Sequence, residues 1–161
     1  RGGFHKSTFR NSNMNEATFD SIVFENCDFE GAQFAFVSMI NAAFRASNMS
    51  FIDFSESNIS KTSFRDTNLK GASFNGANIT SVNFTNGNLA DSQFLSAFIS
   101  DDCDFKNANC TGILLDNGET CIDFCASRNC LCGFVPGPSF PPGPLPTPSR
   151  TPTHSATVTS S

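Results

Sequence analysis

Residues 62–81 read TSFRDTNLKGASFNGANITS, and this stretch consists of four five-residue units. Each unit has a large apolar residue at its centre and a small residue two positions earlier. The centres are Phe64, Leu69, Phe74 and Ile79, and the small residues are Thr62, Thr67, Ala72 and Ala77. A period of five matches neither an α-helix nor a long strand. It predicts short straight pieces joined by a turn every five residues, with both apolar positions pointing inward.

The same period extends in both directions from this stretch. Every fifth residue from Phe4 to Ile99 is Phe, Met, Ile or Leu, which is twenty consecutive positions. One extra residue enters between Ser100 and Asp102, after which the centres are Phe105, Cys110 and Leu115. We interpret residues 122–124, which repeat the Ile-Asp-Phe of residues 52–54, as a last degenerate unit. The turn positions hold residues that tolerate tight corners, such as Gly31, Lys61, Asp66, Gly71, Gly76, Asn86 and Asp91.

The units at residues 67–71, 72–76 and 77–81 resemble the A(D/N)LXX repeat of pentapeptide-repeat proteins. This resemblance covers residues 2 to about 117. It implies an all-β fold, a right-handed quadrilateral β-helix with about 20 residues per coil and coils ~4.8 Å apart. The expected organisation is a β-helix over 1–117, a Cys-rich, disulfide-stapled cap over 118–134 and an extended Pro/Ser/Thr-rich tail over 135–161.

Four-sided coils place residues twenty apart on top of one another. One side is then a continuous column of rings, formed by Phe4, Phe24, Phe44, Phe64, Phe84 and Phe105. The opposite side stacks Met14, Phe34, Phe54, Phe74 and Phe94. These columns account for a composition of 19 Phe with no Trp and no Tyr without invoking a binding site.

The chain has seven cysteines. Cys27 is isolated and is expected to be a buried free thiol. The six disulfide candidates are Cys103, Cys110, Cys121, Cys125, Cys130 and Cys132, with 15 possible connectivities. Zinc is disfavoured because the last four cysteines lack paired zinc-ligand spacing and a nearby His. Disulfides at the end of the solenoid would staple a cap and indicate an extracellular, oxidising compartment.

The tail and several sequons agree with secretion. All eight prolines lie from Pro136 onward, which favours a mucin-like stalk with O-glycosylation candidates Thr147, Ser149, Thr151 and Thr153. A flexible linker is the alternative.

N-glycosylation candidates are Asn48, Asn58, Asn78, Asn83 and Asn109, each one position before a centre and therefore outward. The repeat itself favours Asn there, so sequons also arise by construction. Because the chain opens at Arg1 without Met, we expect a mature fragment.

Several functional classes are disfavoured. The two histidines, His5 and His154, lie at opposite ends of the chain, and no catalytic constellation is assembled. We therefore predict no enzyme, no cofactor and no small-molecule substrate. The acidic residues Asp101, Asp102, Asp104, Asp116, Glu119 and Asp123 could ligate Ca²⁺, but such runs are typical of solvated turns. A net charge of −5 opposes nucleic-acid binding, and no apolar run approaches the ~20 residues of a membrane span.

Some outward positions carry apolar residues, which indicates contact with a partner or with the chain's own tail. These interface candidates are Phe36, Ile40, Phe51, Leu95 and Phe98. Asn58 and Asn78 fall in the same outward column as Phe98, so glycans and close packing are competing hypotheses.

Our hypothesis is a secreted or cell-surface structural module. It would be a rigid building block of a matrix, coat or filament that self-associates head to tail or binds another extracellular protein or glycan. The alternative is a soluble target-binding or inhibitor protein acting through the surface of the rod. Mimicry of nucleic acid is weakly supported, because Arg45, Lys61, Arg65 and Lys70 occupy the middle and no amphipathic C-terminal helix is expected.

Overall fold

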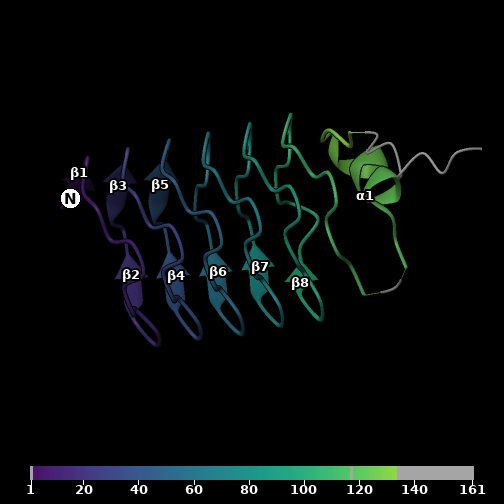
Figure 1. Ribbon diagram of the computed structural model, residues 1–161. Helices are drawn as coiled ribbons and strands as arrows, with labels where there is room; N and C mark the ends of the chain where they lie inside the picture. The colour runs from purple at the N-terminus through teal and green to yellow at the C-terminus, as the bar shows by residue number, and fades with distance from the viewer. Residues whose placement is uncertain (1, 117, 134–161) are drawn as a thin grey trace, which may run out of the picture.

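The computed structural model describes residues 2–116 and 118–133, which form a right-handed four-sided solenoid with a helix at its C-terminal end (Figure 1). The strands are short because each occupies one side of a coil. They are β1 (Gly3–His5), β2 (Thr18–Asp20), β3 (Val23–Glu25), β4 (Ser38–Ile40), β5 (Ala43–Arg45), β6 (Asn58–Ser60), β7 (Asn78–Thr80) and β8 (Phe98–Ile99), followed by α1 (Cys121–Arg128).

All the strand pairs are parallel and join residues one coil apart. One sheet has the order β1-β3-β5 and the other β2-β4-β6-β7-β8. Phe4 pairs with Phe24 and Phe24 with Phe44, so the register is twenty residues. Isolated bridges such as Asn48 to Asn68 continue the same register on other sides. The spacing becomes 21 where Asn83 pairs with Asp104, which confirms the extra residue and, with the parallel pairing, the predicted fold class.

The corners explain why the repeat has five residues. From Lys6 to Ser96, every fifth residue has a φ between 49° and 69°, in the left-handed region. All seven predicted turn residues adopt this conformation, including Asp66 (58°) and Gly71 (66°). Because Gly and Asn adopt positive φ at low cost, they are the residues that suit these corners best. Each left-handed residue changes the direction of the chain and starts the next side.

The predicted columns of Phe rings form the core. Phe64 lies 5.5 Å from Phe44 and 5.5 Å from Phe84, measured between ring centroids, and both pairs are stacked. On the opposite side, Phe54 stacks on Phe74 at 5.2 Å and Phe74 on Phe94 at 4.7 Å. These rings are almost completely buried. Burial of each contributes about 2 kcal/mol, and favourable ring geometry adds to it.

Hydroxyl groups at the small inward positions donate hydrogen bonds to backbone carbonyls. The Oγ of Ser57 donates to the carbonyl of Phe34 at 2.9 Å, and that of Ser92 donates to Leu89 at 2.7 Å. Thr67 donates to the carbonyl of Phe44. No buried polar side-chain atom in the described part of the chain lacks a hydrogen-bond partner. The core therefore accepts Ser and Thr without the usual penalty of burying an unpaired hydroxyl.

The C-terminal end differs from the prediction. Residues 122–124 belong to α1 and are not a repeat, so their interpretation as a last degenerate unit was wrong. Thr120 and Asp123 form a capping box, which satisfies free N–H groups at the start of the helix. Phe124 nevertheless covers the last ring of the column, with an edge-to-face contact of 5.0 Å to Phe105. The helix thus closes the core in place of another coil.

After α1 the chain returns to the solenoid. Asn129 ends the helix with a φ of 54°, and Leu131 then pairs with Asn109 of the last coil. The predicted tail over 135–161, with Thr147, Ser149, Thr151 and Thr153, lies outside the described residues. Within the described ranges, no helix has the length and hydropathy needed to cross a membrane.

The Phe column generates a stability prediction. Replacing Phe64 with Ala should lower the free energy of unfolding by about 3 to 5 kcal/mol, because it opens a cavity between two stacked rings. Arg65→Ala is the matched control. Its guanidinium is exposed and lies 3.3 Å from the exposed Asp66 carboxylate, so the loss should be below about 1 kcal/mol. Urea unfolding measures both, and equal losses would contradict the proposed packing.

Candidate functional site

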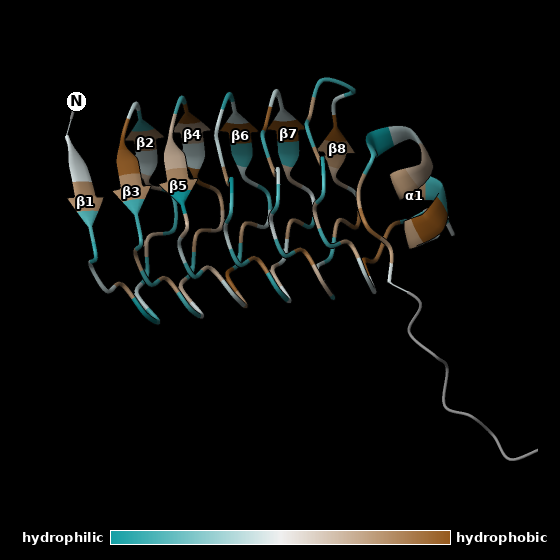
Figure 2. Cartoon of the chain, turned by 90° about the horizontal axis from the view of Figure 1, so that it is seen from above, coloured by the Kyte–Doolittle hydropathy of each residue, from teal (hydrophilic) through white to brown (hydrophobic). Residues whose placement is uncertain are grey.

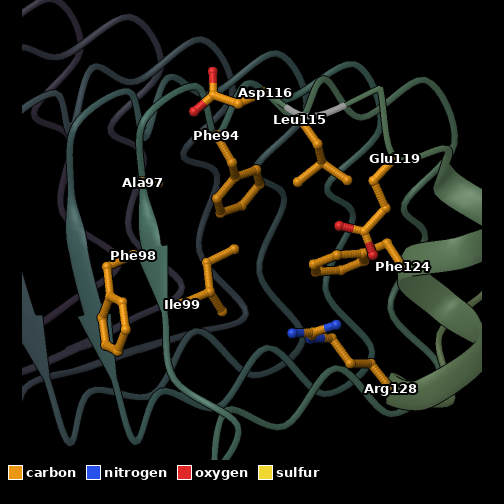
Figure 3. A pocket seen from close by; sticks show the side chains of 9 residues that line it. All are labelled: Phe94, Ala97, Phe98, Ile99, Leu115, Asp116, Glu119, Phe124 and Arg128. Carbon is orange, nitrogen blue, oxygen red and sulfur yellow. The ribbon is translucent and has the colours of Figure 1, made fainter.

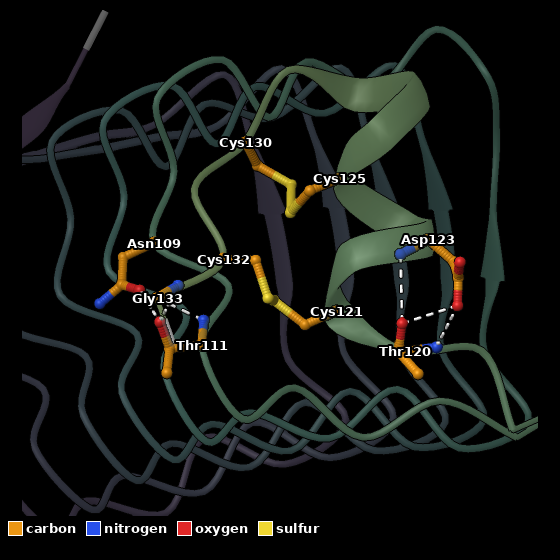
Figure 4. Close-up of a disulfide and its surroundings, with 9 residues drawn as sticks. All are labelled: Asn109, Thr111, Thr120, Cys121, Asp123, Cys125, Cys130, Cys132 and Gly133. Atoms are coloured by element: carbon orange, nitrogen blue, oxygen red, sulfur yellow. Dashed lines mark hydrogen bonds between the residues drawn. A yellow bond between two sulfur atoms is a disulfide. The ribbon is translucent and has the colours of Figure 1, made fainter. Parts of the chain in front are cut away.

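The cysteines divide into bridged and buried free groups. Cys121 is joined to Cys132, and Cys125 to Cys130, so all four cysteines of the cap are paired (Figure 4). Cys27, Cys103 and Cys110 are free and buried. The prediction of a free Cys27 agrees with the structure.

The expectation that Cys103 and Cys110 are bridged is wrong in this structure. The Cys103 thiol packs inside the solenoid and donates to the Ile79 carbonyl at 3.6 Å. Cys110 lies near Cys125 and Cys130, but those two residues are already bonded to each other.

The interface candidates are exposed, and two of them occupy unfavourable corners. Phe36 and Phe51 are each 62% exposed and have φ values of 60° and 58°. A bulky residue in the left-handed region costs roughly 1 to 2 kcal/mol relative to a favourable conformation. The ring of Phe51 lies over Gly71, with its Cδ1 atom 2.7 Å from the position that a Cβ of Gly71 would occupy. The contact with Gly71 therefore partly explains why a Phe occupies the corner at position 51.

The remaining candidates lie on or beside the five-stranded sheet. Ile40, Leu95 and Phe98 are exposed. Phe98 pairs with Asn78, and Asn78 with Asn58, which places all three in one outward column as predicted. Polar residues separate Ile40 from Phe98 along this face. The structure therefore does not join the candidates into one continuous apolar patch.

A groove lies between the last coils and α1 (Figure 3). Its volume is about 320 Å³, and it is lined by Phe94, Ala97, Phe98, Ile99, Leu115, Asp116, Glu119, Phe124 and Arg128. The Arg128 guanidinium lies 4.5 Å from the centroid of the Phe124 ring, a cation–π contact. The Asp116 carboxylate accepts a hydrogen bond from the Ser96 N–H. The groove could hold an apolar group with a charged neighbour.

Sequence reasoning identified Phe98 but missed this groove, because it did not predict α1. A Thr three residues before Asp is the available signal, since it marks a capping box.

The acidic residues predicted as a possible calcium site do not converge. Asp116 and Glu119 line the groove, whereas Asp123 caps the helix. Among the described residues, no three carboxylates come together in the way a cation site requires.

Two carboxylates have lowered pKa values with clear causes. Hydrogen bonds from the Ser100 and Ser81 hydroxyls lower the pKa of Asp102, and hydrogen bonds from Thr120 lower that of Asp123. Both groups therefore favour the folded state above the ordinary pKa of 3.8. That contribution disappears as the pH falls through the lowered values. These interactions identify both residues as structural groups of a turn and a helix cap.

The sequon residues are less uniformly outward than predicted. Asn58 and Asn78 are exposed, but Asn48, Asn83 and Asn109 are half-buried. Asn48 and Asn109 belong to a ladder with Asn68 and Asn88, in which each Nδ2 donates to the coil before it at 3.0 to 3.1 Å. Asn78 donates to Asn58 at 3.3 Å. The amide nitrogen of Asn58 makes no hydrogen bond within the described residues.

The parallel register, left-handed corners and stacked core define a quadrilateral β-solenoid protein. The family model for the pentapeptide repeat region matches residues 17–94. Residues 17–94 are therefore a pentapeptide-repeat region, as the repeated units predicted.

Solved pentapeptide-repeat structures are also similar. One, from the thylakoid lumen of Arabidopsis thaliana, has 18% identity and a TM-score of 0.46, with 66% of this chain and 67% of that chain covered. QnrB1, a plasmid-mediated fluoroquinolone resistance protein, has 16% identity and a TM-score of 0.45, with 81% and 92% covered. HetL from Nostoc, involved in heterocyst differentiation regulation, has 15% identity and a TM-score of 0.29, with 68% and 61% covered. No curated protein matches this chain.

The two unfavourable Phe corners generate the second prediction. Phe36→Asn should raise the free energy of unfolding by about 1 kcal/mol, because Asn adopts positive φ more readily. Phe51→Asn should raise the free energy of unfolding by less, since it removes the ring that covers Gly71. Chemical unfolding of both variants measures the difference. A large loss of stability in Phe36→Asn would show that the Phe36 ring is held for packing.

Proposed function

We propose that this protein is a secreted, non-enzymatic structural module, a rigid building block of an extracellular matrix, surface coat or filament. The observation that carries the proposal is the cap, where two disulfides lie within residues 121–132. Disulfides persist in oxidising compartments such as the secretory pathway and the cell exterior. The solenoid supplies a stiff rod, and its exposed surfaces are suited to contact with other macromolecules.

Both ends of the rod expose apolar side chains. Phe4 in the first coil is 45% exposed, whereas Phe24, Phe44 and Phe64 in the same column are buried. At the opposite end, Leu114, Ile122 and Leu131 are exposed. Figure 2 shows β1 and α1 at opposite ends of the solenoid. Contact between the first coil of one copy and the cap of another is heterologous and does not close, so it builds a fibre. Any chain preceding Arg1 would compete for the first coil.

The alternative is a target-binding or inhibitor protein that acts through the rod surface. It is favoured by Phe36, whose exposed ring occupies a left-handed corner at a cost in stability. Strained residues that the packing does not require often have a role in function.

Light scattering and electron microscopy test the structural proposal. We expect the full chain, secreted from a eukaryotic host, to form elongated assemblies whose mass rises with concentration. Ile122→Asp and Leu131→Asp should each reduce assembly, because a charge would be buried against the first coil. Asp91→Asn, on the side of the rod, is the matched control. A monodisperse monomer at millimolar concentration would contradict assembly, whereas recovery with all four cap cysteines reduced would contradict secretion.

N-glycosylation is a further part of the secreted hypothesis, and the geometry ranks the sequons. We expect Asn58 to be occupied first, since it is exposed and its Nδ2 is not used in the ladder. Asn48 and Asn109 should be poorly occupied in folded protein, because their amides hold neighbouring coils together. Intact mass spectrometry of Asn58→Gln and Asn109→Gln measures this. Loss of glycan from the second variant alone would reverse the ranking.

A further inference from the structure

Three sulfur atoms meet where the solenoid joins the cap. Those of Cys110, Cys125 and Cys130 all lie within 4.8 Å of one another. Cys125 and Cys130 share a disulfide, whereas Cys110 is a fully buried free thiol. Cys110 belongs to the last coil, Cys125 to α1, and Cys130 to the segment that follows the helix. A thiol is therefore held beside a disulfide by three different parts of the fold.

Backbone hydrogen bonds fix this arrangement. The N–H of Cys110 donates to the carbonyl of Leu131 at 2.8 Å, and the N–H of Leu131 donates to the carbonyl of Ala108 at 2.7 Å. These bonds hold the segment containing Cys130 against the coil containing Cys110. Figure 4 shows the Cys125–Cys130 bridge between α1 and the returning segment. The closeness of the three sulfurs therefore follows from the pairing of Leu131 with the last coil.

Both disulfides lie inside the cap, so neither links the cap covalently to the solenoid. The Cys125–Cys130 bridge spans only 5 residues of sequence. A bridge from Cys110 to either partner would span 15 or 20 residues and would tie the cap to the last coil. Since closing a longer loop lowers the entropy of the unfolded chain more, such an isomer would be more stable against unfolding in the chain-entropy model.

We propose that Cys110, Cys125 and Cys130 form a thiol–disulfide exchange site in which Cys110 attacks the bridge between the other two. The Cys110 thiolate bonds to the sulfur of Cys125 or Cys130, and the Cys125–Cys130 bond breaks. The displaced sulfur leaves with the electron pair of that bond and takes up the proton that Cys110 lost. The number of disulfides is unchanged, so no oxidant or reductant is consumed.

Burial sets the rate of this exchange. It raises the pKa of the Cys110 thiol to about 12, with no contribution from a charged side chain of the described residues. The thiol is consequently protonated near neutral pH, and the reactive thiolate is rare. Below the pKa, the thiolate fraction rises about tenfold per pH unit, and the exchange rate should rise with it.

Trapping the displaced thiol tests the proposal in the unsubstituted full chain. The protein is incubated without added thiol at pH 8 and pH 9 with iodoacetamide, and its peptides are mapped after acid quenching. Cleavage after Arg128 separates Cys125 from Cys130. We expect the label on Cys125 or Cys130, Cys110 in a disulfide, and about tenfold faster labelling at pH 9.

Two variants and a dilution series control the experiment. Cys103→Ala removes another buried free thiol that lies outside the sulfur cluster, and it should leave the labelling unchanged. Cys110→Ala should abolish labelling of Cys125 and Cys130, which excludes direct cleavage of the bridge by hydroxide. The rate should not depend on protein concentration. Label on Cys110 alone, or no label on either Cys125 or Cys130 at both pH values, would overturn the proposal.

Discussion

The rest of the structure depends on the stacking of each inward side chain on the residue one coil away. A single five-residue unit cannot bury its apolar centre, because two inward residues make no core. Repetition at a spacing of twenty residues supplies the missing neighbours, so Phe64 is enclosed by Phe44 and Phe84. Every other requirement of the fold, from the left-handed corners to the satisfied inward hydroxyls, keeps this stack in register.

The same dependence makes the ends of the solenoid chemically distinct from its middle. At the C-terminal end, Phe124 takes the place of the next ring and two disulfides hold the short helix that presents it. A helix of 8 residues is too short to be stable alone, so bridging and packing must stabilise it together. Within residues 2–116 and 118–133, no such helix covers the first coil, where Phe4 is 45% exposed. This difference between the two ends of the rod is the structural basis for proposing head-to-tail contacts.

The surface of the rod offers two kinds of functional feature. The exposed Phe36 ring occupies a left-handed corner at a cost in stability, which supports the proposed contact with a partner. The groove beside α1 combines buried aromatic rings with Asp116 and Arg128 at its edge. Phe36 lies in an early coil, whereas the groove lies beside the last coils. One small partner would therefore not contact both. A scaffold that contacts extended or repeated partners is consistent with this separation.

The solenoid could be predicted from the repeat alone, because a period of five with alternating large and small inward residues has one packing solution. The repeat likewise located the corners, the Phe columns, the extra residue near Asp102 and the exposed aromatic residues. The cap could not be predicted in this way. Ile122 to Phe124 match the repeat locally, but the Thr120–Asp123 capping box and the two disulfides favour a helix. The cysteine pairing was also beyond prediction, because it depends on distances between segments far apart in sequence. Spacing could not show that Cys110 would meet Cys125 and Cys130 as a free thiol.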